Sequence, residues 1–386
     1  MKKIAIVSTH AIQYNAPWFQ RLAQVANIQL KVFYTWSQTQ TTVKDKNFGK
    51  EIKWDIPLLE GYDYEFVENI SKNPGSHHFK GIDNPSLVVK IEAFAPDVLL
   101  VFGWKLKSHL KVIRHFKGKT PIWFRGDSTL LDETPGLKAR LRGIVLRWVY
   151  RYIDKALYVG SANKAYFLKY GLKEEQLIYG PHAIDNDRFK GSEADAFDEK
   201  ANQWRTELGF AKDDLVILYA GKFEDKKQPE FLLNAVLKVN TKRKHPLKLL
   251  MVGQGILENK LKTIAGDNNS IKFVPFVNQK KMPIVYRLGD VFCLPSKGPG
   301  ETWGLAVNEA MACSRPVIVS NKVGCANDLV TPDVGWVFKY DRIDELITIL
   351  EQLNPEAIKK KSVQAIKKID FFSYDTMTKA IHNQLF

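Results

Sequence analysis

Two glutamates, with seven residues between them, lie where a loop is expected to lead into a helix. Glu301 belongs to a stretch rich in glycine and proline that follows a buried apolar run, and Glu309 lies on the helix expected to begin near Trp303. Ligands of open α/β sheets bind outside the carboxyl ends of strands, and the start of a helix attracts anions. The segment therefore predicts a phosphate site whose two carboxylates can accept hydrogen bonds from sugar hydroxyls. On spacing alone, two carboxylates that decorate a surface helix are the favoured interpretation.

Buried strands must position these side chains. Short, unbroken apolar runs alternate with amphipathic stretches along most of the chain, and continuous apolarity is typical of strands buried on both faces. The pattern predicts an α/β fold with two Rossmann-like, doubly wound domains. The first run, directly after Met1, is expected to be a strand rather than a secretory signal. The expected strands are 4–8, 29–34, 98–102, 121–124, 156–159, 215–220, 247–252, 271–274, 291–294 and 316–319.

The composition limits the classes of function. A chain of 386 residues fits two domains, and its 45% hydrophobic content excludes a disordered protein. Lys and Arg number 57 against 42 Asp and Glu, so the formal net charge of +15 indicates an anionic partner, whether nucleic acid, phosphorylated substrate or acidic membrane. The cysteines lack disulfide or zinc spacing and favour a reducing compartment. No apolar run reaches bilayer length, so we expect any membrane contact to be peripheral.

Four segments of the second half of the chain occur in an order that is informative as a set. They are a hinge-like segment at 180–185, a glycine and lysine segment at 219–228, an aromatic loop at 273–277 and the paired glutamates at 301–309. Together they resemble the hinge, phosphate segment, nucleobase-side loop and paired-glutamate signature of the bacterial retaining glycosyltransferases of family 4, also called glycosyl transferases group 1. Ordered agreement of four segments is specific evidence for this resemblance.

The resemblance implies a GT-B fold, in which two Rossmann-like domains face a central cleft. It implies a nucleotide-sugar donor, either a UDP-sugar or a GDP-sugar, and no further cofactor. Lys222 and Lys227 would neutralise the donor diphosphate, Glu309 would bind the ribose hydroxyls and Glu301 the donor sugar. For Lys226 we favour a solvated surface role. No metal is expected. The remaining implied donor contacts are Thr302, Trp303, Gly304, Leu305, Phe276, Val277 and Arg125.

Two loops of the first half follow expected strands and carry the other candidate residues. His10 lies in a segment, 8–17, that is similar to the opening of some bacterial family 4 members, although many relatives carry paired glycines there. Asp127 can position or deprotonate an acceptor hydroxyl, and Arg125 can hold the donor phosphate or an anionic acceptor. The candidate catalytic residues are thus Asp127, His10 and Glu301. The alternatives are a structural histidine and a structural Arg–Asp ion pair.

The domain boundary is expected beside the polar segment 186–202. Residues 1–185 would form the acceptor-side domain, with a C-terminal helix at about 371–386 packed back on it, and 186–370 would form the donor domain. The Thr-, Gln- and Lys-rich stretch 37–53 is expected to be a long loop, either on the acceptor side or a surface decoration.

Residues 135–155 predict a basic amphipathic helix. Such helices lie on anionic membranes, and the alternative is a packed helix with a solvated basic face. The membrane interpretation places the protein in the cytoplasm, peripheral on the inner face of the plasma membrane. The basic residues are Lys138, Arg140, Arg142, Arg147, Arg151 and Lys155, against the single acid Asp154.

The function expected from the resemblance is retaining transfer of a sugar from a nucleotide donor to a hydroxyl of a glycan or lipid-linked glycan, in the synthesis of a cell-surface polysaccharide such as lipopolysaccharide or capsule. A front-face displacement is expected, because no nucleophilic carboxylate stands at the family's place for one. A phosphorylase or sugar-phosphate synthase on the same fold is the alternative. A nucleic-acid partner is not expected, because no nucleic-acid-binding motif occurs, and a dehydrogenase is disfavoured because no G-x-G-x-x-G follows the first strand.

Overall fold

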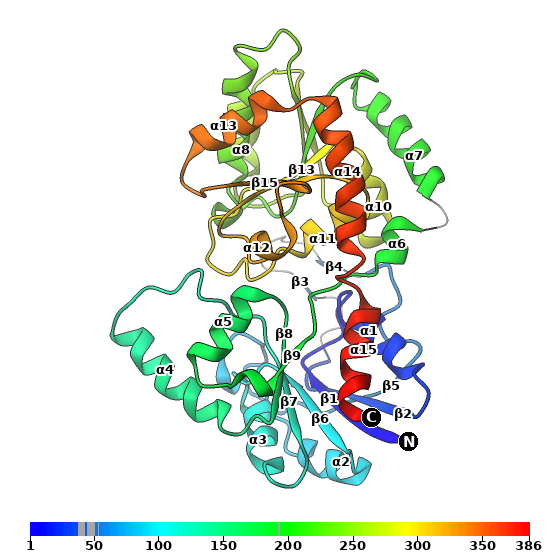
Figure 1. Cartoon of the computed structure of the whole chain (residues 1–386), viewed down its shortest axis with the longest axis vertical. Coiled ribbons are helices and arrows are strands. Elements are labelled where there is room, and N and C mark those ends of the chain that lie inside the picture. Colours follow the sequence, from blue (N-terminus) through cyan, green and yellow to red (C-terminus); the bar gives the residue numbers. More distant parts are fainter. Residues whose placement is uncertain (38–42, 45–50, 53, 192–193) are drawn as a thin grey trace. The chain divides into compact units, whose positions relative to one another are not determined.

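The computed structural model divides the chain into two compact units, each built on its own parallel sheet (Figure 1). It describes residues 1–37, 43–44, 51–52, 54–191 and 194–386. Most of the predicted loop 37–53 therefore lies outside the described residues. The first unit comprises Met1–Val43, Ile56–Pro181 and Tyr374–Phe386, and the second comprises Lys44–Asp55 and His182–Ser373.

The first unit contains a parallel sheet in the strand order β5-β2-β1-β6-β7-β8-β9. β1 and β6 lie at its centre and are buried almost throughout, which explains their unbroken apolar sequences. The strands are β1 (Lys2–Ser8), β2 (Ile28–Tyr34), β5 (Asp63–Phe66), β6 (Val98–Phe102), β7 (Ile122–Arg125), β8 (Lys155–Tyr158) and β9 (Leu177–Tyr179). A separate pair is formed by β3 (Val43–Lys44) and β4 (Glu51–Ile52).

Helices cover both faces of this sheet (Figure 1). Those of one face contribute Leu87, Val112, Val149 and Phe167 to one core with β1 and β6. On the other face the C-terminal helix packs on the first helix, and Arg21 pairs with Asp375 at 2.7 Å. The helices are α1 (Ala16–Ala23), α2 (Leu87–Phe94), α3 (Lys107–Phe116), α4 (Leu137–Tyr150), α5 (Ser161–Lys169) and α15 (Tyr374–Leu385), with short 3-10 turns η1 (Phe79–Gly81) and η2 (Glu174–Gln176).

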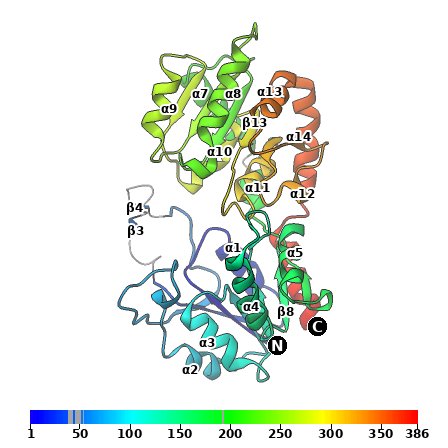
Figure 2. The ribbon, with the colours of Figure 1, turned by 90° about the vertical axis from the view of Figure 1, so that its left-hand side faces the viewer.

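The second unit contains a parallel sheet in the order β12-β11-β10-β13-β14-β15. Helices α8, α9 and α13 cover one face, where α8 and α9 lie side by side (Figure 2), and α6, α7, α10, α11 and α14 pack together on the other. Its strands are β10 (Val216–Ala220), β11 (Lys248–Val252), β12 (Ile271–Val274), β13 (Val291–Leu294), β14 (Val317–Ser320) and β15 (Gly335–Phe338).

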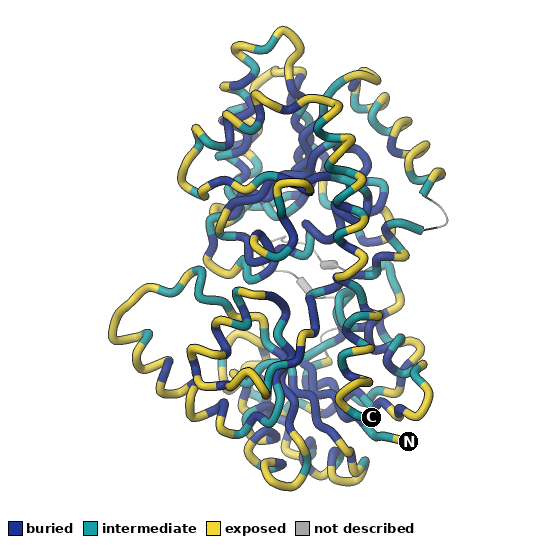
Figure 3. Tube along the Cα trace, in the orientation of Figure 1, coloured by how far each residue is buried: buried dark blue, intermediate teal, exposed yellow. Residues whose placement is uncertain are grey.

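Its helices are α6 (Asn186–Lys190), α7 (Ala194–Glu207), α8 (Pro229–Asn240), α9 (Glu258–Ala265), α10 (Met282–Arg287), α11 (Leu305–Ala312), α12 (Ala326–Leu329), α13 (Ile343–Gln352) and α14 (Pro355–Ile369), with 3-10 turns η3 (Asp225–Lys227) and η4 (Gln279–Lys281). The strands of both sheets form the buried core, whereas α4 is largely exposed (Figure 3). Among the described residues no helix is both long and apolar enough to cross a bilayer.

Every strand predicted from an unbroken apolar run is present, with ends shifted by at most two residues. The two-residue strands β3 and β4, in the stretch expected to be a loop, were not predicted, and in the two large sheets the unpredicted strands are β5, β9 and β15. All three are short edge strands, and β5 and β15 each have exposed residues, namely Asp63 and Val337. Burial on one face leaves an edge strand without a continuous apolar run.

The polar segment 186–202 contains α6 and the first part of α7 in its described residues, and its weak periodicity did not predict these helices. Asp185 caps α6 by accepting a hydrogen bond from the N–H of Arg188 at 3.4 Å. In α7 the one fully buried residue of the described part is Ala201, so this helix lacks the broad apolar stripe that makes a surface helix recognisable.

A buried histidine connects three elements of the first unit. His109 of α3 is fully buried, and its Nδ1 lies 2.9 Å from the carbonyl oxygen of Phe102 at the end of β6. Its Nε2 lies 3.0 Å from Oγ1 of Thr35, directly after β2. Burial lowers the pKa of His109 to about 4, so the folded protein holds this ring neutral at pH 5 and above.

This neutral ring makes folding stability depend on pH. The unfolded chain binds a proton at His109 below about pH 6.5, whereas the folded chain does not until about pH 4. The contribution of His109 to the free energy of unfolding is therefore complete above the pKa of the unfolded chain. It decreases as the pH is lowered, by about 2 kcal/mol between pH 7 and pH 5. We expect the His109→Gln variant to lose this part of the pH dependence in denaturant unfolding. The surface change His115→Gln is the control, and an unchanged pH dependence in His109→Gln would contradict the assignment.

Candidate functional site

Two loops at the carboxyl edge of the second sheet bring predicted residues together. One loop follows β10 and contains η3, and the other follows β13 and leads to α11. Because β10 and β13 are neighbours, both loops leave the sheet at the same edge. Nζ of Lys227, from the first loop, forms an ion pair with Oε2 of Glu301, from the second. Oγ of Ser296 donates a hydrogen bond to the same oxygen at 2.8 Å.

The same loops are joined by further contacts beside this ion pair. The N–H of Lys297 donates to the carbonyl oxygen of Lys226 at 2.9 Å, and Nζ of Lys297 lies 2.7 Å from Asp225. Lys226 itself pairs with Glu224 at 3.3 Å near the surface. The side chain of Lys222 is half-buried directly after β10, on the same loop. Two of the site's lysines, Lys222 and Lys227, thus lie on one loop, and Lys227 contacts a carboxylate.

Glu309 lies on α11, the helix that follows the loop of Glu301. Its side chain is buried, and Tyr286 of α10 donates a hydrogen bond from its hydroxyl to Oε2 of Glu309 at 2.6 Å. Since Tyr286 is also fully buried, its ring fixes the position of the carboxylate. Glu309 is therefore a buried carboxylate held by Tyr286 and does not decorate the surface of the helix.

Trp303 and Gly304 shape the turn that leads into α11. The indole of Trp303 is buried and donates from Nε1 to Oδ1 of Asn308 at 2.8 Å, and the Asn308 amide donates to the carbonyl oxygen of His182 at 3.1 Å. Gly304 has φ of 95°, and a Cβ there would lie 2.7 Å from Val323. The helix begins at Leu305, two residues later than predicted, because Gly304 is left-handed.

The backbone of Gly324 supports the loop that carries Glu301 and Thr302. Its N–H donates to the carbonyl oxygen of Glu301 at 3.0 Å, and the next N–H, from Cys325, donates to that of Trp303 at 2.9 Å. A Cβ at Gly324 would lie 1.7 Å from the carbonyl oxygen of Thr302. Close approach of two backbones thus requires glycine at this position.

The aromatic loop after β12 leaves the same edge of the sheet. Phe276 and Val277 are both half-buried there, two strands from β10 in the sheet order. Among the described residues no group of three or more His, Cys, Asp or Glu side chains is placed to hold a metal ion.

The first unit places its candidate residues after β1 and β7. Arg125 ends β7 and is buried, and its guanidinium donates to the carbonyl oxygens of Gly180 at 2.8 Å and Pro181 at 3.3 Å. It also lies over the ring of Trp18, 5.6 Å from the centroid. Burial lowers the pKa of Arg125 to about 10, opposed by the charge of Asp127. Asp127 itself is exposed.

His10 follows β1 and is half-buried, with its ring edge-on to Trp36 at 5.9 Å. Its Nδ1 is buried and has no hydrogen-bond partner among the described residues. Burial lowers the pKa of His10, so the imidazole is neutral near pH 7. A neutral ring with a free nitrogen can accept a proton or hydrogen bond from a ligand.

Three contributors to the site escaped the sequence analysis: Ser296, Tyr286 and Gly324. Each acts on a residue that is distant in the sequence or through a backbone approach, so no local pattern marks it. For Gly324 the small residues around it, Val323 to Ala326, are the one signal that could have suggested close packing.

The hydrogen bond between Tyr286 and Glu309 can be tested by stability. Tyr286→Phe keeps the ring but removes a donor to a buried carboxylate, and we expect a loss of about 1–3 kcal/mol in unfolding free energy. Tyr152→Phe, which keeps its ring contact with Trp148, is the matched control and should change little. Equal stability of wild type and Tyr286→Phe would show that the hydrogen bond does not hold Glu309.

Comparison with known proteins agrees with this architecture. Residues 200–368 match the family model for glycosyl transferases group 1. An uncharacterized glycosyltransferase of Methanocaldococcus jannaschii is 29% identical over 150 residues, which are 38% of this chain and 37% of that relative. A D-inositol 3-phosphate glycosyltransferase of Rhodococcus erythropolis is 25% identical over 83% of this chain and 77% of its own length.

Among solved structures, Anabaena HepE in complex with UDP and glucose superposes with a TM-score of 0.70 at 17% identity, covering 100% of this chain and 99% of HepE. The structural similarity to HepE shows which fold the chain has. The chain therefore has the GT-B fold of two Rossmann-like domains, and the comparisons support a glycosyltransferase of group 1.

Proposed function

We propose that the protein is a retaining, metal-independent glycosyltransferase of family 4 that uses a UDP- or GDP-sugar as its donor. The observation that carries the proposal is the carboxyl-edge cluster of the second unit, in which Lys227, Ser296 and Glu301 are in direct contact and Glu309 is held by Tyr286. Cations and positioned carboxylates at one sheet edge suit a ligand that carries both a diphosphate and sugar hydroxyls. A solved neighbour, HepE, is described in complex with UDP and glucose.

The ion pair indicates how the donor is received. Lys227 and Glu301 satisfy each other in the free protein. A donor diphosphate competes for the Lys227 ammonium, with Lys222 beside it, and Glu301 then turns its carboxylate to a hydroxyl of the donor sugar. Glu309 accepts hydrogen bonds from the ribose hydroxyls. Main-chain N–H groups at the start of α11 add a positive helix end near the phosphates, with Thr302 and Leu305 closest in sequence.

Transfer then proceeds on one face of the donor sugar. The bond between the anomeric carbon and the phosphate oxygen breaks, the acceptor oxygen bonds to the same face, and the acceptor proton moves to the departing phosphate. Lys222 and Lys227 stabilise the charge of the nucleoside diphosphate as it leaves. The first unit supplies the acceptor side through Asp127 and His10, and Arg125 acts as a positioning residue through Gly180 and Pro181.

The acceptor proposed is a hydroxyl of a glycan or lipid-linked glycan, as in bacterial lipopolysaccharide or capsule synthesis. The support lies in α4, whose apolar side chains are exposed beside basic ones: Leu137 is 73% exposed, Leu141 55% and Ile144 62%. A helix with only a solvated basic face would not expose these groups. We infer that α4 lies on the anionic inner face of the plasma membrane, which makes the protein cytoplasmic and peripheral.

The donor site is tested by Lys227→Ala and Glu309→Ala. Each removes a charge that contacts the donor, and we expect kcat/KM for sugar transfer to fall by about 10²-fold or more. Lys226→Ala, which removes a neighbouring surface lysine, should remain within about twofold of wild type. Wild-type rates of donor hydrolysis and transfer in either site variant would refute the assignment.

A screen of nucleotide sugars by thermal shift identifies the nucleobase of the donor, since the right donor raises the unfolding midpoint of wild type more than that of Lys227→Ala.

The membrane proposal is tested by vesicle flotation. Wild-type protein should float with vesicles that contain phosphatidylglycerol and not with pure phosphatidylcholine, and added salt should weaken binding. The double change Leu141→Ser and Ile144→Ser removes two exposed apolar groups of α4 and should reduce binding at least about fivefold. Val89→Ser, an exposed apolar residue of α2, is the control. Equal flotation with both lipids would overturn this part of the proposal.

A further inference from the structure

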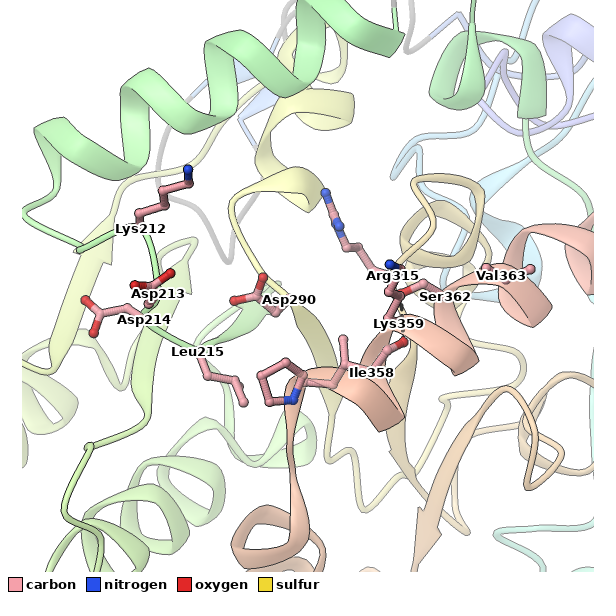
Figure 4. Close-up of a pocket in the computed structure, with 11 residues that line it drawn as sticks. Lys212, Asp213, Asp214, Leu215, Asp290, Arg315, Ile358, Lys359, Ser362 and Val363 are labelled. Atoms are coloured by element: carbon pink, nitrogen blue, oxygen red, sulfur yellow. Dashed lines mark hydrogen bonds between the residues drawn. The ribbon is translucent and has the colours of Figure 1, made fainter.

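A pocket of about 470 Å³ lies in the second unit, at the amino edge of its sheet (Figure 4). Leu215, Asp290 and Arg315 line it, and each lies one or two residues before a strand, β10, β13 or β14. Since the strands are parallel, this edge is opposite to the one that carries Glu301. The first turns of α14 form another side of the pocket. The remaining lining residues are Lys212, Asp213, Asp214, Pro355, Ile358, Lys359, Ser362 and Val363.

Two carboxylates of the pocket, Asp290 and Asp214, already have partners within the fold. Both oxygens of Asp290 lie 3.2 Å from Nη1 of Arg205, and one accepts the N–H of Val216 at 2.8 Å. Asp214 accepts the N–H of Ala211 at 2.7 Å and lies 3.7 Å from Lys248. These two acids are therefore neutralised by groups of the fold, and they do not call for a cation from outside.

The basic side of the pocket is less completely matched. Nε of Arg315 is buried and has no hydrogen-bond partner among the described residues. Its Nη2 lies 3.5 Å from Asp198, an exposed carboxylate that also pairs with Nε of Arg287 at 3.2 Å. One solvated carboxylate is thus shared between two guanidinium groups. A buried N–H donor without an acceptor is costly, so the groups of the fold satisfy the Arg315 guanidinium only in part.

Lys359 adds a second positive charge on the same side. It is an exposed residue of α14 that lines the pocket together with Arg315, and Figure 4 draws both at the end opposite to Asp213 and Asp214. Between these charges the wall is apolar, formed by Leu215, Ile358 and Val363. Val363 is 49% exposed, so apolar surface is open to a ligand.

We propose that this pocket binds a small amphipathic anion, with a phosphate or carboxylate group against Arg315 and Lys359 and an apolar body against Leu215, Ile358 and Val363. The anionic group meets two cationic side chains that line the pocket, Arg315 and Lys359, and the apolar part of the ligand covers the exposed side chains of α14. The volume lies within the range, roughly 300–1,000 Å³, that suits small-molecule ligands. The site is separate from the carboxyl-edge cluster and does not depend on the proposed transfer reaction.

Calorimetric titration of the full chain with phenyl phosphate tests the proposal. Inorganic phosphate and phenol serve as the charged and apolar halves of that probe, and each should bind at least about tenfold more weakly than phenyl phosphate. Lys359→Glu reverses a charge on an exposed position and should weaken phenyl phosphate binding at least about tenfold. Lys360→Ala, on the neighbouring residue outside the pocket, should leave it unchanged. Arg315→Gln should also weaken binding.

The same titration can overturn the proposal in three ways. Phenyl phosphate binding that is lost in Lys227→Ala and kept in Lys359→Glu would place the anion at the opposite edge of the sheet. Equal affinity for phenyl phosphate and inorganic phosphate would remove the apolar half of the site. Absence of saturable binding at millimolar phenyl phosphate would show that the pocket does not bind an amphipathic anion.

Discussion

The contact between Lys227 and Glu301 is the interaction on which the carboxyl edge of the second unit depends. Both side chains are largely withdrawn from solvent, at 23% and 11% exposure, so each charge needs the other. Removal of either partner leaves an uncompensated charge between two loops. Because the loops follow neighbouring strands, the ion pair also fixes the geometry at which β10 and β13 present their ends. The free protein thus keeps its site organised with its own charges.

Such an ion pair needs a rigid support, and the backbone provides it. The carbonyl oxygens of Glu301 and Trp303 accept hydrogen bonds from the N–H groups of Gly324 and Cys325, so the loop is held along its length as a strand would be. Gly304 then turns the chain sharply into α11. The carboxylate of Glu309 follows on that helix, where Tyr286 holds it. Backbone contacts therefore set the positions of the Glu301 loop and the start of α11 before any ligand is bound.

The sequence predicted those parts of the protein whose cause is local. Central strands such as β6 and β13 are buried on both faces and show it in an unbroken apolar run, whereas the edge strand β5 alternates and went unpredicted. The paired glutamates and the lysines of the phosphate segment were identified through a family resemblance rather than through periodicity. Tyr286 and Ser296 could not be found in this way, because their roles come from contacts across the fold.

Burial also separates residues that look alike in the sequence. Arg125 and Lys227 were both expected to meet the donor, yet Arg125 uses its guanidinium on main-chain carbonyls within the first unit. The inward direction of Arg125 is decided by the position of Gly180 and Pro181, 55 and 56 residues away in the chain. No pattern around Arg125 contains that information.

The positive net charge of the chain cannot come from the site itself. Lys227 is matched by Glu301, and Arg125 is buried against carbonyl oxygens, so neither contributes much to the field outside the protein. Exposed cations lie beside exposed apolar side chains along α4 and, at Lys359 and Val363, on the first turns of α14. A cation beside exposed apolar surface favours amphipathic anions over fully hydrated ones, because both parts of such a ligand lose unfavourable exposure on binding. Such positions suit the amphipathic partners that we propose for α4 and for the pocket beside α14.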